Sequence, residues 1–433
     1  MSLPRISAGR VVPSQRRTDE GRGSRWWRNA EVIGHDDLLA LLVPVVGATA
    51  CQSVSTGASK ARVAGLRRRT RMDCFAGLDV SIDETAICVV NEAGKVMMTA
   101  SVTTDPGSIA AALAPYRQQL RRVGHEAGAL APWLHPGLKE LGVPIVCLET
   151  RHVRAAMSAQ RNKTDATDAL GLAHIMRTGW YRAAHIKTEA CYRVRLLLTQ
   201  RRNLKRKFLD LENTIRHSLK SFGIKLGGVG RGHFDQAVRD AVAADRLSSE
   251  LMDCMLRARA ALWAEYVKLH KLVLQIVARD ELCRRFLDIP GVGPITALSF
   301  ATAIDDPHRF RRSRDVAAYF GLTGKRWQSG TSIDIKGRIS KAGDPEMRRS
   351  LYEAATVLLT RYKRPDKVKE WGQKLAKSKC HAKACVAVAR KLAVIMHAMW
   401  KDGTFYHGAP ETGPADLRRK LTHHEPKVMA VVL

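Results

Sequence analysis

Two carboxylates in the segment RNKTDATDA, residues 161–169, are spaced so that they can act together. The apolar residues that follow have helical spacing, and a helix that begins near Thr164 places Asp165 and Asp168 on one face. Like charges held together are unfavourable unless a cation lies between them, and a divalent metal ion is the usual solution. The charged first turn of a solvated helix explains the same residues about equally well.

Further carboxylates follow short apolar runs upstream. FAGLDV, residues 75–80, carries Asp79, and two more runs complete a predicted three-stranded meander. An acid on an otherwise buried strand is costly unless it is paired or binds metal. Val123 to His125 predict a strand that delivers Glu126, and residues 143–152 predict another that carries Glu149. The predicted order is three strands, helix, strand, helix, strand, helix, which is the layout of an RNase H-like nuclease core.

These acids carry a resemblance to a known family. The set Asp79, Glu126, Asp165 and Asp168 resembles the DEDD site of the IS110-type transposases, whose N-terminal domain is RuvC-like, and NKTDATDA is close to the most characteristic motif of that family. Glu126 is preferred to its rival Glu149 because HEAG supplies the family's Glu-Ala-Gly context. The residues after that glycine, Ala-Leu-Ala, depart from the family pattern.

The composition indicates a polyanionic partner. The chain has 433 residues, with 72 Lys and Arg against 41 Asp and Glu, which gives a formal net charge of +31. A protein this basic usually binds nucleic acid. Nine cysteines without a CxxC pair indicate reduced thiols and a cytoplasmic location. The apolar run at residues 38–50 is too short to span a bilayer, so no membrane partner is expected.

The first 71 residues lack core periodicity, and we expect a disordered basic extension. Met72 stands directly before the first predicted strand, where the resembling family normally begins. An upstream start codon assigned in error explains the extension more simply than a basic DNA-binding tail. We therefore predict that a chain starting at Met72 keeps its binding and activity.

The middle of the chain is predicted to be helical. After the RuvC-like domain at residues 73–185, residues 186–285 contain two long amphipathic segments with a glycine-rich stretch between them. This pattern predicts an antiparallel coiled-coil hairpin. One alternative is an ordinary helical hairpin that packs on its neighbours, and the other is an arm that dimerises or holds RNA. The arginine-rich outer face favours contacts with phosphate groups.

The region 286–407 changes character again. PGVG, which contains Gly291 and Gly293, precedes an apolar helix and predicts a helix-hairpin-helix, whose backbone N–H groups grip a phosphate at a helix start. A basic, glycine-rich loop follows and contains Ser329. A serine beside glycine in a loop is commonplace, and no His-Asp partner for it is evident. The loop contains the cations Lys325, Arg326, Lys336, Arg338 and Lys341.

The resemblance gives this serine a role. AYFGLTGKRWQSG and GRISKAGDPEMRRSLYEAA are similar to the motifs of the family's C-terminal transposase domain, in which Ser329 takes the position of the catalytic serine. Ser340 and Ser350 are weaker candidates. Arg348 in the second motif is a predicted nucleic-acid contact. The tail at residues 408–433 is Pro-rich and charged, and we expect it to be flexible.

The expected fold class is α/β plus all-α: an RNase H/RuvC-like domain, an antiparallel coiled-coil hairpin and a helical C-terminal domain with a helix-hairpin-helix. The resemblance implies a transposase that cleaves and rejoins DNA through a phosphoserine, with Mg²⁺ on the four acids and a structured guide RNA. It also implies a homo-oligomer, a dimer or tetramer, in the bacterial cytoplasm at the nucleoid. The alternatives are a metal-dependent Holliday-junction-type endonuclease and a decayed, non-catalytic DNA-binding transposase.

Overall fold

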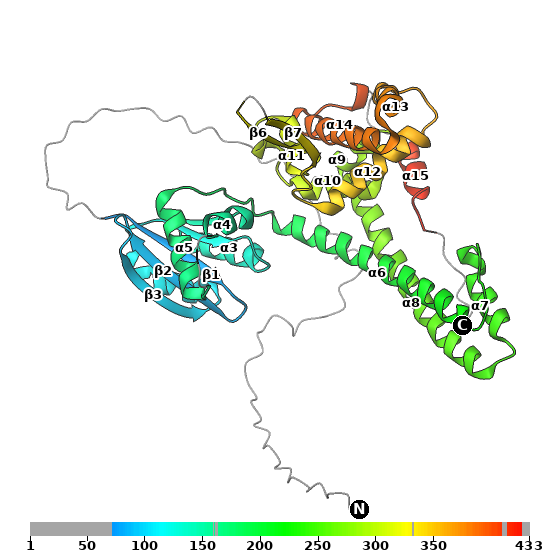
Figure 1. Ribbon diagram of the computed structural model, residues 1–433, viewed down its shortest axis with the longest axis horizontal. Helices are drawn as coiled ribbons and strands as arrows, with labels where there is room; N and C mark the ends of the chain where they lie inside the picture. Colours follow the sequence, from blue (N-terminus) through cyan, green and yellow to red (C-terminus); the bar gives the residue numbers. More distant parts are fainter. Residues whose placement is uncertain (1–71, 159, 161–162, 331–332, 409–413, 427–433) are drawn as a thin grey trace, which may run out of the picture. The chain divides into compact units, whose positions relative to one another are not determined.

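The computed structural model describes residues 72–158, 160, 163–330, 333–408 and 414–426 (Figure 1). The predicted extension over residues 1–71 lies outside them. No helix in these described ranges is long and apolar enough to cross a membrane.

A five-stranded mixed sheet forms the first folded part. The order is β3-β2-β1-β4-β5, with β1–β2 and β2–β3 antiparallel and β1–β4 and β4–β5 parallel. This order is consistent with the predicted RNase H-like domain. The strands span β1 Cys74–Val80, β2 Glu84–Asn91, β3 Val96–Thr103, β4 Leu120–Glu126 and β5 Ile145–Leu148.

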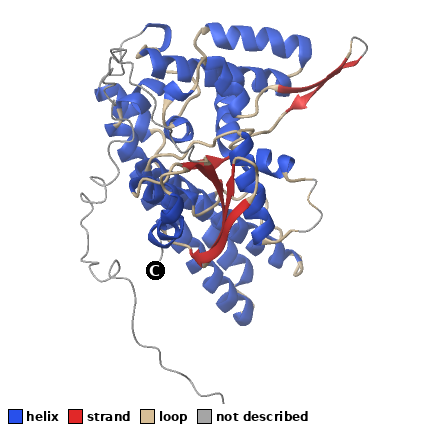
Figure 2. Cartoon of the chain, turned by 90° about the vertical axis from the view of Figure 1, so that its left-hand side faces the viewer, coloured by secondary structure: helices blue, strands red, loops and turns tan. Residues whose placement is uncertain are grey.

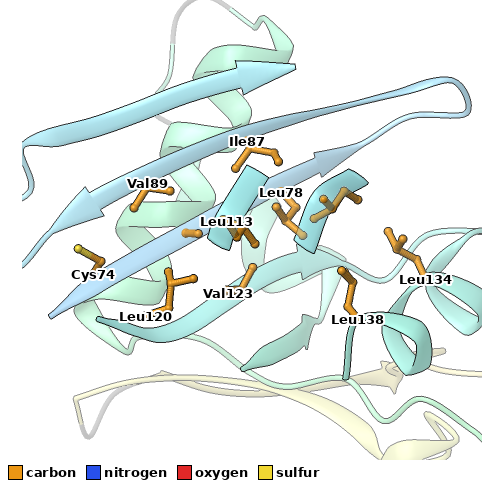
Figure 3. Packing of buried hydrophobic residues seen from close by; sticks show 11 residues of the cluster. Cys74, Leu78, Ile87, Val89, Leu113, Leu120, Val123, Leu134 and Leu138 are labelled. Carbon is orange, nitrogen blue, oxygen red and sulfur yellow. The ribbon is translucent and has the colours of Figure 1, made fainter. Parts of the chain in front are cut away.

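Helices cover both faces of this sheet. Because successive strand residues point to opposite faces, Leu78 and Val123 pack on one face with helices α2 (Pro106–Leu113) and α3 (Ala131–Glu140) (Figure 3). The other face packs on the short α4 (Thr150–Ala156) and on α5 (Asp165–Thr178), in a core formed by Phe75, Val90, Leu148, Leu172 and Met176 among others. The predicted carboxylates lie at the ends of β1, β4 and α5.

The predicted helical middle contains two long helices, α6 (Glu189–Lys220) and α8 (Arg246–Arg279). Phe208 packs on Trp263 and Ile215 on Leu256, so the two helices run antiparallel. A third helix, α7 (Phe234–Val242), packs between their ends and was not predicted. The fully buried Arg259 fixes this end, because it donates hydrogen bonds to Asp235 at 2.6 Å and to Glu212 at 3.0 Å and has cation–π contacts with Phe208 and Phe234.

The C-terminal part is helical apart from a two-stranded ribbon. Its elements are α9 Glu281–Phe286, α10 Pro294–Ile304, α11 Ser313–Tyr319, β6 Gly324–Ser329, β7 Ile333–Ile339, α12 Pro345–Thr360, α13 Lys367–Lys379 and α14 His381–Asp402. The segment predicted as a basic loop is therefore an antiparallel ribbon, and Figure 2 shows its two strands standing clear of the helices.

Part of the tail over residues 408–433, for which we expected flexibility, is helical. Residues 414–422 form helix α15 (Pro414–Thr422). Lys420 Nζ lies 2.8 Å from Asp288 Oδ1, and His270 Nε2 lies 2.7 Å from the carbonyl oxygen of His424. Pro414 starts this helix because proline is favourable in a first turn, where its missing N–H costs nothing.

Candidate active site

Glycine on two neighbouring strands lets helix α5 approach the sheet. Gly77 on β1 pairs in register with Gly124 on β4. A Cβ atom at Gly77 would lie 2.1 Å from the carbonyl oxygen of Ala169 and 2.4 Å from the amide nitrogen of Ala173. Any side chain there would therefore push the α5 backbone away. Asp168 directly precedes Ala169, so this close contact sets how near that carboxylate comes to the sheet.

The two strand acids lie on the face that α5 covers. Asp79 follows Gly77 by two residues and Glu126 follows Gly124 by two, so all four positions point to the same face. Leu78 pairs with His125 in the parallel register, which makes Asp79 and Glu126 the next positions on adjacent strands. Both carboxylates are half-buried.

The start of α5 is fixed by its own sequence. Thr164 is the N-cap: its hydroxyl accepts a hydrogen bond from the Thr167 amide at 3.2 Å, and the Thr167 hydroxyl accepts one from the Thr164 amide at 2.9 Å. This reciprocal capping holds Asp165 and Asp168 in the first turn. The helix therefore begins where the sequence predicted, and its amide dipoles add positive potential beside the acids.

The four acids interact electrostatically. Burial raises the pKa of Asp79, and the negative charges of Asp168 and Asp165 raise it further. Burial also raises the pKa of Glu126, with added contributions from Asp79 and Asp168. Each strand acid therefore experiences the charge of its neighbours. Asp79 therefore lies within electrostatic reach of each of the other three acids, and the four residues are called the acid cluster below.

Lys163 is a cation of this cluster that sequence reasoning did not single out. Its ammonium group lies 3.6 Å from Asp168 Oδ2. Its positive charge partly offsets the rise in the pKa of both Asp79 and Glu126. The Lys163 side chain is 87% exposed, whereas that of Asp168 is 13% exposed. An exposed lysine can leave at little cost, so a more strongly bound cation can replace it. Its place directly before the Thr164 cap was the available signal.

Glu149, the rival for the second acid, lies elsewhere. Glu126 pairs with Leu148 on β5, and the Leu148 side chain belongs to the core under α5. Glu149 is the next residue along the chain, so it does not share that face. Its carboxylate lies 2.6 Å from Arg151 and 3.4 Å from Arg182. Two arginines therefore neutralise the charge of Glu149, whereas Glu126 is repelled by the negative charge of Asp79.

The chemistry of the cluster fits a divalent cation. Carboxylate oxygens are the donors that hard ions such as Mg²⁺ prefer, and their mutual repulsion is relieved by a positive charge. Among the described residues, no three His, Cys, Asp or Glu side chains are close enough together to hold a metal ion. The charge and donor type therefore fit such an ion, whereas the spacing requires the carboxylates to move together around it.

The cluster borders a cavity of about 410 Å³ between β2, β3 and the start of α5. Asp165 lines this cavity with Glu84, Thr99 and Ser101. Ala86, which pairs in register with Asp79, lines it as well. Asp165 therefore lies beside a hollow over β2 and β3, where an extended ligand can reach it.

Ser329 ends β6 in the ribbon. All six residues of β6 are exposed. Ser329 pairs with Ile333 and Trp327 with Ile335, so the serine stands at the tip of the ribbon, where the chain passes from β6 to β7. Arg326, a predicted nucleic-acid contact, has its guanidinium 2.6 and 3.0 Å from the two carboxylate oxygens of Asp334. Lys325, Arg338 and Lys341 are exposed cations in or near the ribbon.

Three other predicted contact residues have structural partners. Arg348 donates hydrogen bonds to the carbonyl oxygens of Phe320, Ala342 and Gly343. Gly291 has a φ of +89°, and a Cβ atom on it would lie 2.3 Å from the Ala354 carbonyl oxygen of α12. Gly293 caps α10, and a Cβ atom on it would lie 3.0 Å from the His424 ring. Both glycines therefore allow close packing.

Two regions of the chain match models of known transposases. A model described as the Transposase IS116/IS110/IS902 family matches residues 283–370, and a transposase model of the DEDD IS110 type matches residues 76–224. The chain is 29% identical to the transposase for insertion sequence element IS1111A of Coxiella burnetii, over 77% of this chain and 91% of that one. It is also 29% identical to the transposase for IS1328 of Yersinia enterocolitica, over 66% and 85%. A pilin gene-inverting protein of Moraxella bovis is 34% identical over 113 residues, 26% of this chain and 34% of its own.

The mixed sheet, the acid cluster and the two matched regions define a DNA transposase with a DEDD domain. The chain belongs to the IS110 family of insertion-sequence transposases. The family implies cleavage and transfer of DNA, and its DEDD domain implies the use of a divalent metal ion.

Proposed function

We propose that this transposase cuts and rejoins DNA through a covalent link to Ser329. The observation that supports this most directly is the exposed position of Ser329 at the tip of a basic ribbon, in the region that matches the transposase family. A nucleophile of this kind must reach a phosphodiester that is itself part of a large, stiff polymer. A hydroxyl at the tip of a ribbon meets that requirement better than one in a closed pocket.

In the proposed step the Ser329 hydroxyl oxygen attacks a backbone phosphorus. The new bond is Ser329 Oγ–P, the bond that breaks joins phosphorus to one sugar oxygen, and the hydroxyl proton ends on that leaving oxygen. Reversal with a different sugar hydroxyl rejoins the strand. Because each phosphodiester is exchanged for another ester, no ATP is required, and the chain has no GxxxxGK[ST] motif.

The proposed ligands of a divalent ion are Asp79, Glu126, Asp165 and Asp168, and Mg²⁺ is the proposed ion because all four donors are carboxylates. When bound, such an ion supplies positive charge to the phosphate oxygens and to the leaving oxygen. The protein contributes the placement of the acids. Gly77 sets the distance of α5 from the sheet, and Thr164 fixes the first turn of that helix.

Substitution of Ser329 by alanine tests the proposal. Ser329→Ala removes only the attacking oxygen, so DNA binding should persist while cleaved and joined products disappear. The unsubstituted protein should leave a DNA-linked species that survives denaturation and is destroyed by protease. Ser340→Ala is the matched control and should retain activity. Undiminished cutting by Ser329→Ala would favour the endonuclease, in which water attacks at the acid cluster and the serine is incidental.

We also propose that the transposase binds a structured guide RNA. The formal charge of +31 suits a large nucleic-acid load, and α6 presents Lys205, Arg206, Lys207 and Lys220 as exposed cations. RNA transcribed from a structured non-coding segment beside the gene should copurify with the protein. Its affinity should fall steeply with salt, since each phosphate contact releases counterions. Copurification of no RNA from cells that carry the whole element would exclude this part.

The acids and the serine lie in different parts of the chain, and we propose that a homo-oligomer, a dimer or tetramer, brings both kinds of site to the DNA. Light scattering of the purified protein with and without DNA measures the subunit number. A monomer both with and without DNA would exclude the proposed homo-oligomer.

A further inference from the structure

The two faces of the ribbon differ in composition. Residues two apart on a strand share a face, so Lys325 and Trp327 lie on the face of Ser329. Contacts support this, because a Cβ atom on Gly337 of β7 would lie 2.6 Å from the Trp327 ring and 3.5 Å from the Lys325 Cβ. Arg326 lies on the opposite face, where it pairs with Asp334.

Trp327 is exposed on the face that carries the serine. The residue is 54% exposed, and its register partner Ile335 is 58% exposed. A two-stranded ribbon has no core to bury such residues, so an apolar pair on its surface is unfavourable unless something covers it. Gly337 gives the indole room, and glycine in a strand interior often marks a close approach of this kind. The ring is therefore held over Gly337, on the face of the ribbon that carries Ser329, without being buried.

We propose that Trp327 stacks on a nucleobase of the DNA strand that Ser329 attacks. This inference rests on the proposed serine chemistry for its place in the reaction. Two residues along a strand span about 7 Å, which is about two base steps of 3.4 Å. The stacked base would thus lie within one or two nucleotides of the attacked phosphate. Its aromatic partner orients that nucleotide. The Lys325 ammonium lies 6.0 Å from the centroid of the Trp327 ring and would move from there to the phosphate backbone when the base stacks.

Charge favours a nucleic-acid strand over a protein as the occupant. Residues 324–339 contain four cations and one acid: Lys325, Arg326, Lys336, Arg338 and Asp334. A polyanion therefore complements the ribbon. Stacking accepts any base, since every base has a π-face. Trp327 would then hold the strand without choosing its sequence, which leaves sequence choice to another part of the system.

The test measures binding in the Ser329→Ala protein, which separates stacking from chemistry. The probes are a 20-nucleotide oligodeoxythymidylate and an abasic deoxyribose-phosphate strand of equal length, at elevated salt to weaken the phosphate contribution. Adding Trp327→Ala should weaken binding of the base-bearing strand by about 5- to 150-fold and leave the abasic strand unchanged. Trp327→Phe should retain most of the affinity, and Trp133→Ala, an exposed tryptophan on α3, should change neither.

Equal losses on both probes, or no loss on either, would overturn the stacking role. Retention by Trp327→Phe guards against a ribbon that simply fails to form, since phenylalanine keeps the ring and the strand propensity. The Ser329→Ala protein, with Trp327 intact, could still cut DNA while the added Trp327→Ala substitution weakens binding of the base-bearing strand alone. That result would refute the serine chemistry and support the stacking site. A Trp327→Ala protein that binds both probes normally removes the site whatever the serine does.

Discussion

The acid cluster and the serine ribbon reach their geometry in opposite ways. The acids lie over a buried core, and backbone contact at Gly77 sets how closely α5 approaches the sheet. Every residue of β6 in the ribbon is exposed, and a Cβ atom at Gly330 would meet nothing within 4 Å. One site is held by packing, whereas the other is held by two strands alone.

This difference indicates where each site gains its precision. The backbone of a packed site is organised before the ligand arrives, and only the carboxylate side chains have to move, so the sensitivity of the site extends to residues that never touch the ligand. An exposed ribbon gains its final position from what it binds, so its sensitivity is confined to residues that contact the DNA. Substitutions in the two regions should therefore have different kinds of effect.

The largest effect is expected at the acids. Asp79→Asn keeps the shape of the side chain and removes its charge, so cleavage should fall by on the order of 10³-fold while DNA binding persists. Glu126→Gln should behave alike. Glu149→Gln is the matched control and should leave the rate unchanged, because Arg151 and Arg182 hold that carboxylate. Loss of cleavage in Glu149→Gln with retention in Glu126→Gln would reverse the choice of the second acid.

A pair of glycine substitutions compares the two regions directly. Gly77→Ala forces the α5 backbone outward and should destabilise the acid domain by about 1–3 kcal/mol. It should also lower cleavage by displacing Asp168. Gly330→Ala places a methyl group in open space, so its cost is the left-handed backbone alone, roughly 1 kcal/mol at φ +56°.

Thermal unfolding and cleavage rates of the two proteins provide the measurement. The expected pattern is a lower melting temperature and a lower rate for Gly77→Ala, and a small change in both for Gly330→Ala. Equal losses in the two proteins would mean that the ribbon is as tightly organised as the sheet.

The sequence was most informative where structure is local. The start of α5 was predictable because Thr164 and the following acids are a helix-start pattern, and the strands of the sheet because they are short apolar runs with turns between them. Placing Glu126 rather than Glu149 in the cluster needed the pairing of β4 with β5, which is not a local property. The family motif supplied that choice from the sequence.

The missed elements have identifiable causes. The ribbon over residues 324–339 was predicted as a loop because glycine and charge dominate it, although Ile333, Ile335 and Ile339 are two and four residues apart, as on one face of a strand. Helix α15 was not predicted because the tail at residues 408–433 is Pro-rich and charged, a composition typical of flexible segments. Distances between carboxylates depend on Gly77 and its contact with α5, and no spacing along the chain encodes such a contact.

The smallest expected effect concerns the stability of the acid domain without metal. Burial and neighbouring charges raise the pKa of Asp79 in the folded protein, so its ionised form disfavours folding. This penalty is absent below the unfolded pKa near 3.8 and is fully present once the pH exceeds the raised folded value. Asp79→Asn removes the penalty. In the presence of EDTA at pH 7, the variant should therefore melt slightly above the unsubstituted protein, and this gain should shrink as the pH falls toward 4. Ser329→Ala, in the exposed ribbon, should show no such pH-dependent gain.

Mg²⁺ should reverse the order of the two melting temperatures at pH 7, because an ion that binds the folded carboxylates stabilises only the protein that retains them. An Asp79→Asn protein that melts lower in EDTA at every pH would mean that Asp79 is compensated within the fold, and that the cluster does not repel itself in the absence of metal.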